Sequence, residues 1–318
     1  VVVMAILSTI GILLKFNFKP YNHIFTMFIL VCQFLTMYIY ILFICVYLYR
    51  FSFKFVKRRP YRFGNIVATM IAISGFHSHY NKKEVIYHVT VPKTSSVSKL
   101  KICLVSDLHL SSGTYMRQVR KLVKTVNDKH YDLVCFAGDV FDENTPDALM
   151  NRSLQEFKNM KSTYGTYWIS GNHEYYGKHT DFTVFEKYNI HFLKNTYETV
   201  DNTFNIVGFT DKTSHDHYDI NKVIEGMNTS LPTITLDHNP ERFDHHTYFT
   251  DLQLSGHTHN GQIFPGNIIL HYYYQNSYGL SHYKNHYLLV SGGYGSWGFP
   301  FRLGTQCEYD TIYLTMRK

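Results

Sequence analysis

The fold is decided by residues 101–139, which begin KICLVSDLH and end DLVCFAGD. Two short apolar runs, 101–106 and 132–137, flank a segment over 115–129 whose apolar residues are spaced as on one face of a helix. These residues are Met116, Val119, Leu122, Val123 and Val126. A strand, a helix and a second strand in this order predict two adjacent parallel strands joined by a crossover helix.

More strands are predicted on both sides of this unit. A helix is expected over 146–160. Strands are expected over 84–91, 166–170, 204–209, 233–236, 251–254, 287–291 and 311–315. Because strands outnumber helices in the second half, we expect mixed sheets rather than one purely parallel, doubly wound sheet.

Each of five apolar runs is followed by side chains of the kinds that bind metal ions. The clusters are DLH at 107–109, GD at 138–139, GNHE at 171–174, DHNP at 237–240 and GHTH at 256–259. The carboxyl ends of strands in an α/β sheet meet at one crevice, so the clusters predict one shared site. In extended backbone, residues two apart point the same way, so DLH and HTH are each expected to direct two ligands at one point. The glycines of the clusters are expected to let the backbone turn sharply and approach a ligand closely.

The candidate metal ligands are Asp107, His109, Asp139, Asn172, His238, His257 and His259. Imidazole mixed with carboxylate favours manganese, iron or zinc over calcium or magnesium, and we expect manganese, with iron and zinc as alternatives. Seven ligands exceed the roughly three that a catalytic zinc ion takes from its protein. Two divalent ions that share one bridging carboxylate fit this set, and such pairs serve phosphoester hydrolysis.

The clusters D-L-H, G-D, G-N-H-E and G-H-T-H, in this order, resemble the calcineurin-like metallophosphoesterase superfamily over residues 99–318. DHNP at 237–240 and SGGYGSWGFPFRLG at 291–304 resemble its membrane-associated bacterial branch, which includes twin-arginine-exported and lipid-A-related phosphodiesterases. The resemblance implies a two-sheet αββα sandwich. Asn260 stands where that branch usually has glycine, and we expect it to tune the site rather than abolish it.

The resemblance also implies a role for each ligand. One metal ion would be held by Asp107, His109 and His259. The other would be held by Asn172, His238 and His257, with Asp139 bridging the two. A hydroxide between the ions would attack phosphorus in line. His173 would be catalytic rather than a ligand, and would stabilise the developing charge or protonate the leaving oxygen.

For some neighbouring side chains the sequence leaves two alternatives open. Asp142 is expected to start a turn or helix, with support of a metal ligand as the alternative. The 294–302 loop, with Trp297, Phe299 and Arg302, is expected either to form a lip of the cleft or to close the sheet as a hydrophobic latch.

Residues 1–80 are predicted to be a membrane region with two to three hydrophobic segments, followed by a catalytic domain over 81–318. The run over 24–49 has no charged residue and exceeds the roughly 20 residues that span a bilayer. Residues 1–14 are interpreted as a truncated span, and 63–76 as either a short membrane helix or an interfacial segment. If 63–76 crosses, the basic stretch over 50–62 places the catalytic domain outside the cytoplasm, the side that we favour; otherwise that domain is cytoplasmic.

The charge is distributed unevenly. Residues 1–83 hold ten Lys/Arg and no Asp or Glu, so the remainder holds 21 basic residues (31 less these ten) against 24 acidic ones, a net of −3. A broad basic surface on the catalytic part is therefore disfavoured, and we expect neither a nucleic-acid partner nor a nuclease.

The predicted function is that of a membrane-tethered binuclear phosphoesterase acting on a phosphodiester or pyrophosphate bond. The expected partners are the lipid bilayer and a phosphoester substrate, for which a lipid is the candidate because tethering concentrates the enzyme at a lipid surface. The alternative is a metallophosphoesterase fold that binds other proteins and has lost catalysis. The complete set of seven ligands together with His173 argues against this alternative.

Overall fold

The computed structural model describes residues 60–110, 116–177 and 182–317. The chain divides into two units, Val1–His77 and Ser78–Lys318. Within the described residues, no helix combines the length and apolar character needed to cross a bilayer. This includes α3 (Pro60–Tyr80), which contains the predicted segment 63–76, so the option that this segment crosses is not supported. The predicted spans over 1–14 and 24–49 lie outside the described residues.

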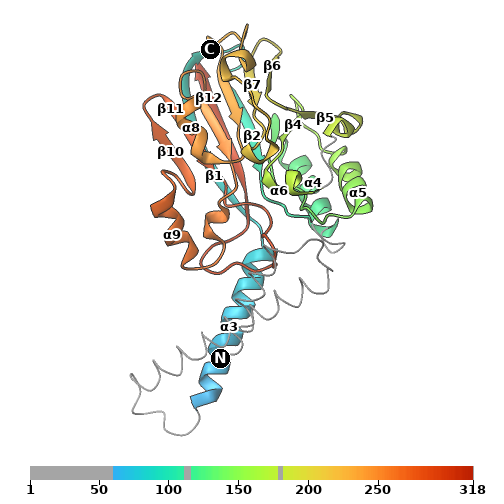
Figure 1. The fold of residues 1–318 in the computed structure, drawn as a ribbon, viewed down its shortest axis with the longest axis vertical. Coiled ribbons are helices and arrows are strands. Elements are labelled where there is room, and N and C mark those ends of the chain that lie inside the picture. The colour runs from blue at the N-terminus through green and yellow to red at the C-terminus, as the bar shows by residue number, and fades with distance from the viewer. Residues whose placement is uncertain (1–59, 111–115, 178–181, 318) are drawn as a thin grey trace. The chain divides into compact units, whose positions relative to one another are not determined.

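The second unit is built on two six-stranded mixed sheets (Figure 1). The first has the order β1 (Lys83–Thr94), β12 (Glu308–Arg317), β2 (Lys99–Val105), β3 (Leu133–Ala137), β4 (Thr166–Ile169) and β5 (Ile190–Phe192). The second has the order β10 (Gly279–Tyr283), β11 (His286–Val290), β9 (Leu252–Ser255), β8 (Thr233–Leu236), β7 (Phe204–Gly208) and β6 (Thr196–Val200).

Each sheet contains a block of four consecutive parallel strands. In the first sheet these are β2 to β5, and in the second they are β7, β8, β9 and β11. The first sheet also contains a second parallel pair, β1 with β12. Antiparallel pairing joins β12 to β2, β10 to β11 and β6 to β7. The mixed sheets predicted from the sequence are therefore confirmed.

The main core lies between the two sheets. Apolar side chains of the first sheet, such as Ile102 and Leu104, belong to one buried cluster with side chains of the second, such as Leu252 and Leu254. All four are fully buried. Each Å² of apolar surface removed from water stabilises the folded state by about 25 cal/mol, and this burial holds the two sheets together.

Helices cover the outer face of each sheet. On the first sheet, α4 (Met116–Lys129), α5 (Asp147–Phe157) and the 3₁₀ helix η2 (Phe182–Tyr188) pack around Trp168 of β4. The second sheet carries α7 (Ile220–Val223) and α8 (Phe243–His246), which contribute to smaller clusters on its outer face. Two further helices follow strand ends: α6 (Asn172–Tyr176) comes after β4, and α9 (Gly266–Tyr273) comes after β9 and the 3₁₀ helix η5 (His259–Gly261). The αββα sandwich is thus present.

Candidate metal centre

The predicted ligands follow the carboxyl ends of parallel strands from both sheets. In the first sheet, Asp107 and His109 come after β2, Asp139 after β3, and Asn172 after β4. In the second sheet, His238 comes after β8, and His257 and His259 come after β9. Because parallel strands end at the same edge of a sheet, both sheets deliver these side chains to one end of the sandwich.

One group of ligand atoms belongs to Asp107, His109 and His259, which lie within 4.8 Å of one another. The Nε2 atoms of the two histidines are 3.0 Å apart. His259 Nε2 is also 3.4 Å from Asp107 Oδ1. These are the three residues predicted to hold one ion.

A second group belongs to Asp139, His238 and His257, again within 4.8 Å of one another. Asp139 Oδ2 lies 3.2 Å from His238 Nε2. Asn172 joins this group, because its Oδ1 is 2.9 Å from His257 Nδ1. Asp139 Oδ2 is also 3.9 Å from His109 Nε2, so this carboxylate lies between the two groups, where a bridging ligand would be needed.

The histidine tautomers fit a divalent cation. His238 Nδ1 donates to the Ala137 carbonyl over 2.7 Å, and His109 Nδ1 contacts Asp142 Oδ1 over 2.6 Å. Histidines that bind metal commonly donate the opposite ring N–H to a carbonyl or carboxylate in this way. The arrangement directs His238 Nε2 into the centre, where it lies 3.2 Å from Asp139 Oδ2 without a hydrogen bond of good geometry among the described residues.

The electrostatics favour positive charge in the centre. Burial lowers the pKa of His109, but the carboxylates of Asp142, Asp139 and Asp107 outweigh it and raise that pKa to about 9. Burial would raise the pKa of Asp139, but His238 above all holds it well below its usual range. In contrast, burial and the neighbouring His109 keep the pKa of His259 well below the ordinary value. Ionised carboxylates are thus balanced by imidazole protons, which bound cations would displace.

The backbone at the ligands differs from the predicted extended geometry. Five of the predicted ligands have positive φ angles between 50° and 74°: Asp107, His109, Asp139, His257 and His259. They lie beyond the strand ends, so the interpretation of DLH and HTH as extended segments was wrong. Left-handed turns direct these side chains instead. Positive φ is unfavourable for non-glycine residues, and such conformations concentrate at functional sites.

The three glycines of the clusters are required because there is no room for a side chain. A Cβ at Gly138, whose φ is +86°, would lie 2.6 Å from the backbone nitrogen of Gly171. A Cβ at Gly171 would overlap Asp139 Oδ1, and one at Gly256 would overlap Ser106 Oγ. Ser106 in turn donates to Asp107 Oδ2 over 2.5 Å. The backbone at these positions therefore packs closely against neighbouring side chains, and its predicted approach to a bound ligand stays a prediction.

His173 lies beside the ligands at the start of α6. Its backbone N–H donates to Asp139 Oδ1 over 2.8 Å, and its ring centroid is 4.8 Å from that of His109. Its Nδ1 is 2.9 Å from Glu143 Oε2 and 3.5 Å from Asp142 Oδ1. A histidine oriented by carboxylates in this way has the arrangement of a general acid or base.

Glu174 organises the centre, and the sequence reasoning assigned it no role. This buried carboxylate accepts four backbone N–H groups, from Asp139, Val140, Phe141 and Gly171, at 2.7–3.0 Å. Burial, followed by the charge of Asp139, raises its pKa to about 7. The sequence could have indicated this role, because Glu174 is the last residue of the cluster GNHE.

Arg302 is a second partner of the ligands. It is fully buried rather than at a cleft lip, and its Nη1 donates to the His259 carbonyl over 2.9 Å. Its Nη2 is 3.1 Å from His259 Nδ1. Asp142, for which support of a ligand was the alternative, contacts His109 as described above.

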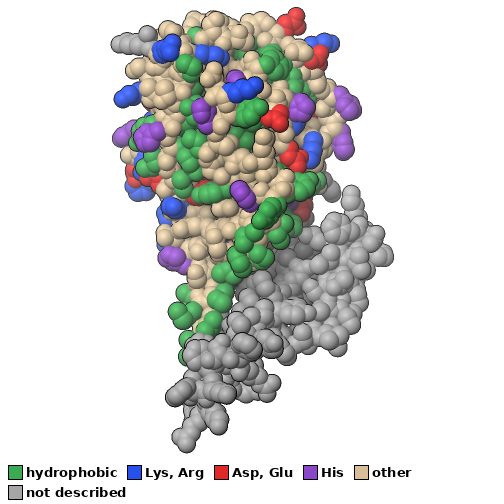
Figure 2. All heavy atoms as spheres, turned by 90° about the vertical axis from the view of Figure 1, so that its left-hand side faces the viewer, with side chains coloured by type: hydrophobic (Ala, Val, Ile, Leu, Met, Phe, Trp, Pro, Cys, Tyr) green, Lys and Arg blue, Asp and Glu red, His purple; other side chains and the backbone are tan. Residues whose placement is uncertain are grey.

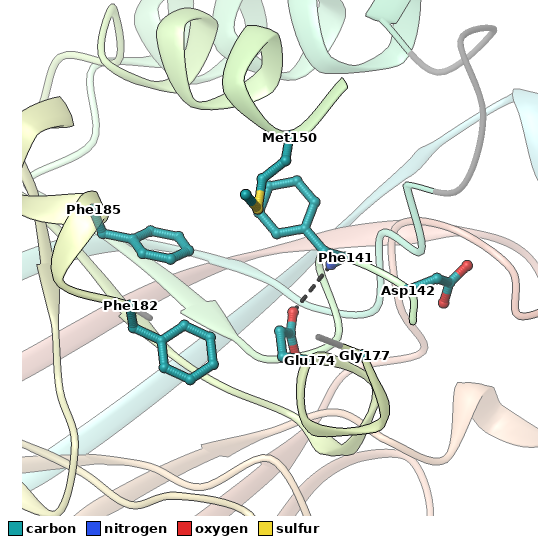
Figure 3. Close-up of a pocket in the computed structure, with 7 residues that line it drawn as sticks. All are labelled: Phe141, Asp142, Met150, Glu174, Gly177, Phe182 and Phe185. Atoms are coloured by element: carbon teal, nitrogen blue, oxygen red, sulfur yellow. Dashed lines mark hydrogen bonds between the residues drawn. The ribbon is translucent and has the colours of Figure 1, made fainter. Parts of the chain in front are cut away.

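A small pocket lies behind the centre (Figure 3). It is lined by Phe141, Asp142, Met150, Glu174, Gly177, Phe182 and Phe185. Its volume of about 10 Å³ is about what one water molecule needs. Figure 3 shows the carboxylate of Glu174 directed at the backbone N–H of Phe141. The pocket therefore lies among the side chains that hold the loop after β3 in place.

Comparison with known proteins agrees with this geometry. Residues 100–261 match the calcineurin-like phosphoesterase family. An uncharacterized metallophosphoesterase of Helicobacter pylori is 34% identical over 224 residues, which cover 68% of this chain and 60% of that protein. A transmembrane protein with metallophosphoesterase domain of Bos taurus is 29% identical over 242 residues, which cover 69% of this chain and 54% of that protein. The chain thus spans less than two thirds of the length of these relatives.

Proposed function

The chain belongs to the calcineurin-like phosphoesterases. We propose that it is a metal-dependent phosphoesterase that hydrolyses a phosphodiester or pyrophosphate bond with two divalent cations. The observation that carries this proposal is the position of Asp139 between two groups of ligand atoms. A carboxylate shared in this way suits a pair of ions rather than one.

Asp107, His109 and His259 would hold one cation, and Asn172, His238 and His257 the other. Two cations bound there supply Lewis-acid stabilisation of the phosphoryl oxygens and a more acidic water. We propose manganese for both positions, because mixed imidazole and carboxylate ligands suit it, as they suit iron or zinc.

His173 acts on the substrate in this proposal. Its ring is oriented through Nδ1 by Glu143 and Asp142, so Nε2 is the atom that exchanges a proton with the leaving oxygen. The same ring contributes a hydrogen bond to the charge that develops on phosphorus oxygens, which is the main requirement of phosphoryl transfer.

We also propose that the enzyme is tethered to a membrane and acts on a lipid phosphoester. The uncharged run over 24–49 supports this, as does the bovine relative, which is named as a transmembrane protein. Nucleic acid is not proposed as the substrate. On the face drawn in Figure 2, Lys and Arg side chains are scattered rather than gathered into one stripe.

The test is turnover of a chromogenic phosphodiester by the full chain, stripped of metal and then reloaded with Mn²⁺. We expect activity that depends on the metal and falls at least about 100-fold in His173→Ala, the range for loss of one general acid or base. Asp139→Asn should lose both metal and activity, whereas His173→Ala should still bind metal.

Two outcomes would contradict the proposal. A folded protein that binds no divalent cation removes the metal centre altogether. Metal binding without turnover of a diester, a monoester or a pyrophosphate leaves the fold acting as a binding module, which is the alternative function.

A further inference from the structure

Exposed apolar side chains gather on α9 and two neighbouring loops. We call this set the apolar rim: Phe264, Ile268, Ile269, Tyr272, Tyr273 and Trp297. Tyr272 is 86% exposed and Tyr273 72%. The sequence over 252–283 contains no Asp, Glu, Lys or Arg. An exposed apolar group of this kind, with no charge among it, marks an interaction surface.

The rim borders the metal centre. The ring of Trp297 is 6.1 Å from that of His173. On the other side, Tyr274, which follows α9, has its ring 6.4 Å from that of His257. Gln262 joins the two parts of the rim, because its side chain hydrogen-bonds both the N–H and the carbonyl of Trp297, each over 2.9 Å. A surface that covered the rim would therefore face the catalytic centre.

The same loop receives the chain from its N-terminal region. Residues 78–80 begin the catalytic unit, and His79 Nδ1 lies 2.8 Å from Ser296 Oγ, next to Trp297. The Ser78 carbonyl accepts the N–H of Cys307 over 3.0 Å. The chain thus enters the catalytic unit beside the rim, and upstream of this entry it carries the uncharged run over 24–49.

We propose that the apolar rim docks onto a lipid bilayer and presents the metal centre to a phosphoester in the lipid headgroup region. This inference rests on the proposed function for its substrate, but not for its docking surface. Tryptophan, tyrosine and isoleucine are side chains that suit the boundary between headgroups and acyl chains. Since the rim has no basic residue, docking requires no anionic lipid and depends little on salt.

A second copy of the chain, or another protein, is the competing occupant of an exposed apolar surface. The bilayer is favoured because the uncharged run lies upstream of the entry point beside the rim, and because the centre borders it. Figure 1 shows α9 at the end of the second sheet, beyond β10, rather than packed across a sheet face.

Fluorescence of Trp297 reports docking directly. The chain has two tryptophans, of which Trp168 is fully buried and Trp297 is 48% exposed. The full chain is reconstituted in nanodiscs of phosphatidylcholine with and without bromine on the acyl chains. We expect brominated lipid to quench a large share of the emission, to the same extent at low and high salt, and we expect Trp297→Phe to remove that quenching.

The variant Ile268→Ser/Ile269→Ser/Tyr273→Ser should reduce the quenching of Trp297 at least fivefold. Tyr248→Ser is the matched control. Tyr248 is also an exposed tyrosine, at 58%, but it lies before the start of β9, whereas the metal centre lies after the end of that strand. Emission of Trp297 that brominated lipid leaves unchanged would overturn the proposal. Emission that shifts to the blue with protein concentration, without lipid quenching, would assign the rim to a second copy instead.

Activity separates this inference from the proposed function. The triple variant should keep its turnover of a soluble chromogenic diester and lose at least fivefold on a lipid phosphodiester in the nanodisc. Failure of the proposed function would appear as no turnover of either substrate with quenching intact. Equal turnover of both substrates by the triple variant and the unmodified chain would contradict docking as the route to substrate.

Discussion

Asp310 lies buried on β12, with both carboxylate oxygens lacking a hydrogen-bond partner among the described residues. It has the same parity along the strand as Ile312 and Leu314, which pack between the sheets. Burial first, and then the charge of Glu308, raises its pKa well above the ordinary value. The folded protein therefore keeps a proton on this group at pH values where the unfolded chain has lost it.

This proton predicts a dependence of stability on pH. A carboxyl whose pKa is raised by folding makes its full contribution to the free energy of unfolding at pH values below its unfolded pKa. It loses that contribution as the pH rises through its folded pKa. Asparagine does not titrate, so Asp310→Asn removes this loss of stability. The free energy of unfolding of the variant, relative to that of the original chain, should therefore increase from pH 5 to pH 8. We expect a relative gain of at least about 1 kcal/mol.

Urea unfolding of the full chain, followed by tryptophan fluorescence at both pH values, measures this gain. Asp128→Asn is the control, because Asp128 is largely exposed and its ion pair with Lys124 contributes little to stability. A difference between Asp310→Asn and the original chain that does not change with pH would contradict the prediction.

At the residue scale, the sequence predicted which side chains come together better than it predicted the groups that contact them. The candidate ligands stand in short clusters after apolar runs, and the structure places all seven at one end of the sandwich, although their binding of metal stays a prediction. Arg302 was expected in a lip or latch rather than against a candidate ligand, and Glu143 was not assigned, because no spacing rule connects them to the histidines that they contact. Their roles arise from loops whose path is set by tertiary packing.

At the scale of elements, strands with two buried faces were found, whereas three of the four outer strands were missed; the fourth, β1, was predicted over 84–91. All residues of the strands β3, β8 and β9 are buried, and these strands coincide closely with the predictions. In contrast, β5, β6 and β10 were not predicted. Each is an outer strand of its sheet with partly exposed residues, so its hydrophobic pattern is weak.

The turn from β4 into α6 makes a prediction of its own. Gly171 precedes Asn172 and leaves no room for a Cβ beside Asp139. Gly171→Ala should displace the Asp139 carboxylate and lower the affinity for Mn²⁺ on the order of 10–100-fold, the range for residues that support metal ligands. Calorimetric titration with Mn²⁺ measures the affinity.

Gly177→Ala provides the comparison at the other end of α6. Its added Cβ would lie 3.2 Å from Glu143 Cα, a tight contact but not an overlap with a ligand atom. We expect a much smaller change in affinity there. Equal losses in the two variants would mean that any strain in α6, rather than displacement of Asp139, weakens the centre.

At the scale of the whole catalytic unit, the metal centre joins the two sheets. Asp107, Asp139 and Asn172 follow strands of the first sheet, whereas His238 and His257 follow strands of the second. The main core already holds the sheets together along their length. Cations at this end would add a second connection between them, at the point where left-handed turns replace the strands.

Metal removal should therefore lower the stability of the unit as a whole. At a free Mn²⁺ concentration 100 times the dissociation constant, one site adds about 2.7 kcal/mol to the free energy of unfolding. We expect the chelated full chain to unfold at a lower temperature than the loaded chain. Asp139→Asn should lose most of this difference. His173→Ala should keep it while losing activity, because the contact of residue 173 with Asp139 is made by its backbone N–H.

Thermal unfolding of the three proteins, with and without Mn²⁺, measures these differences. If the loaded and chelated chains unfolded at the same temperature while activity depended on Mn²⁺, the ion would not be bound by residues of both sheets, and the assignment of Asp139 as the shared ligand would be wrong.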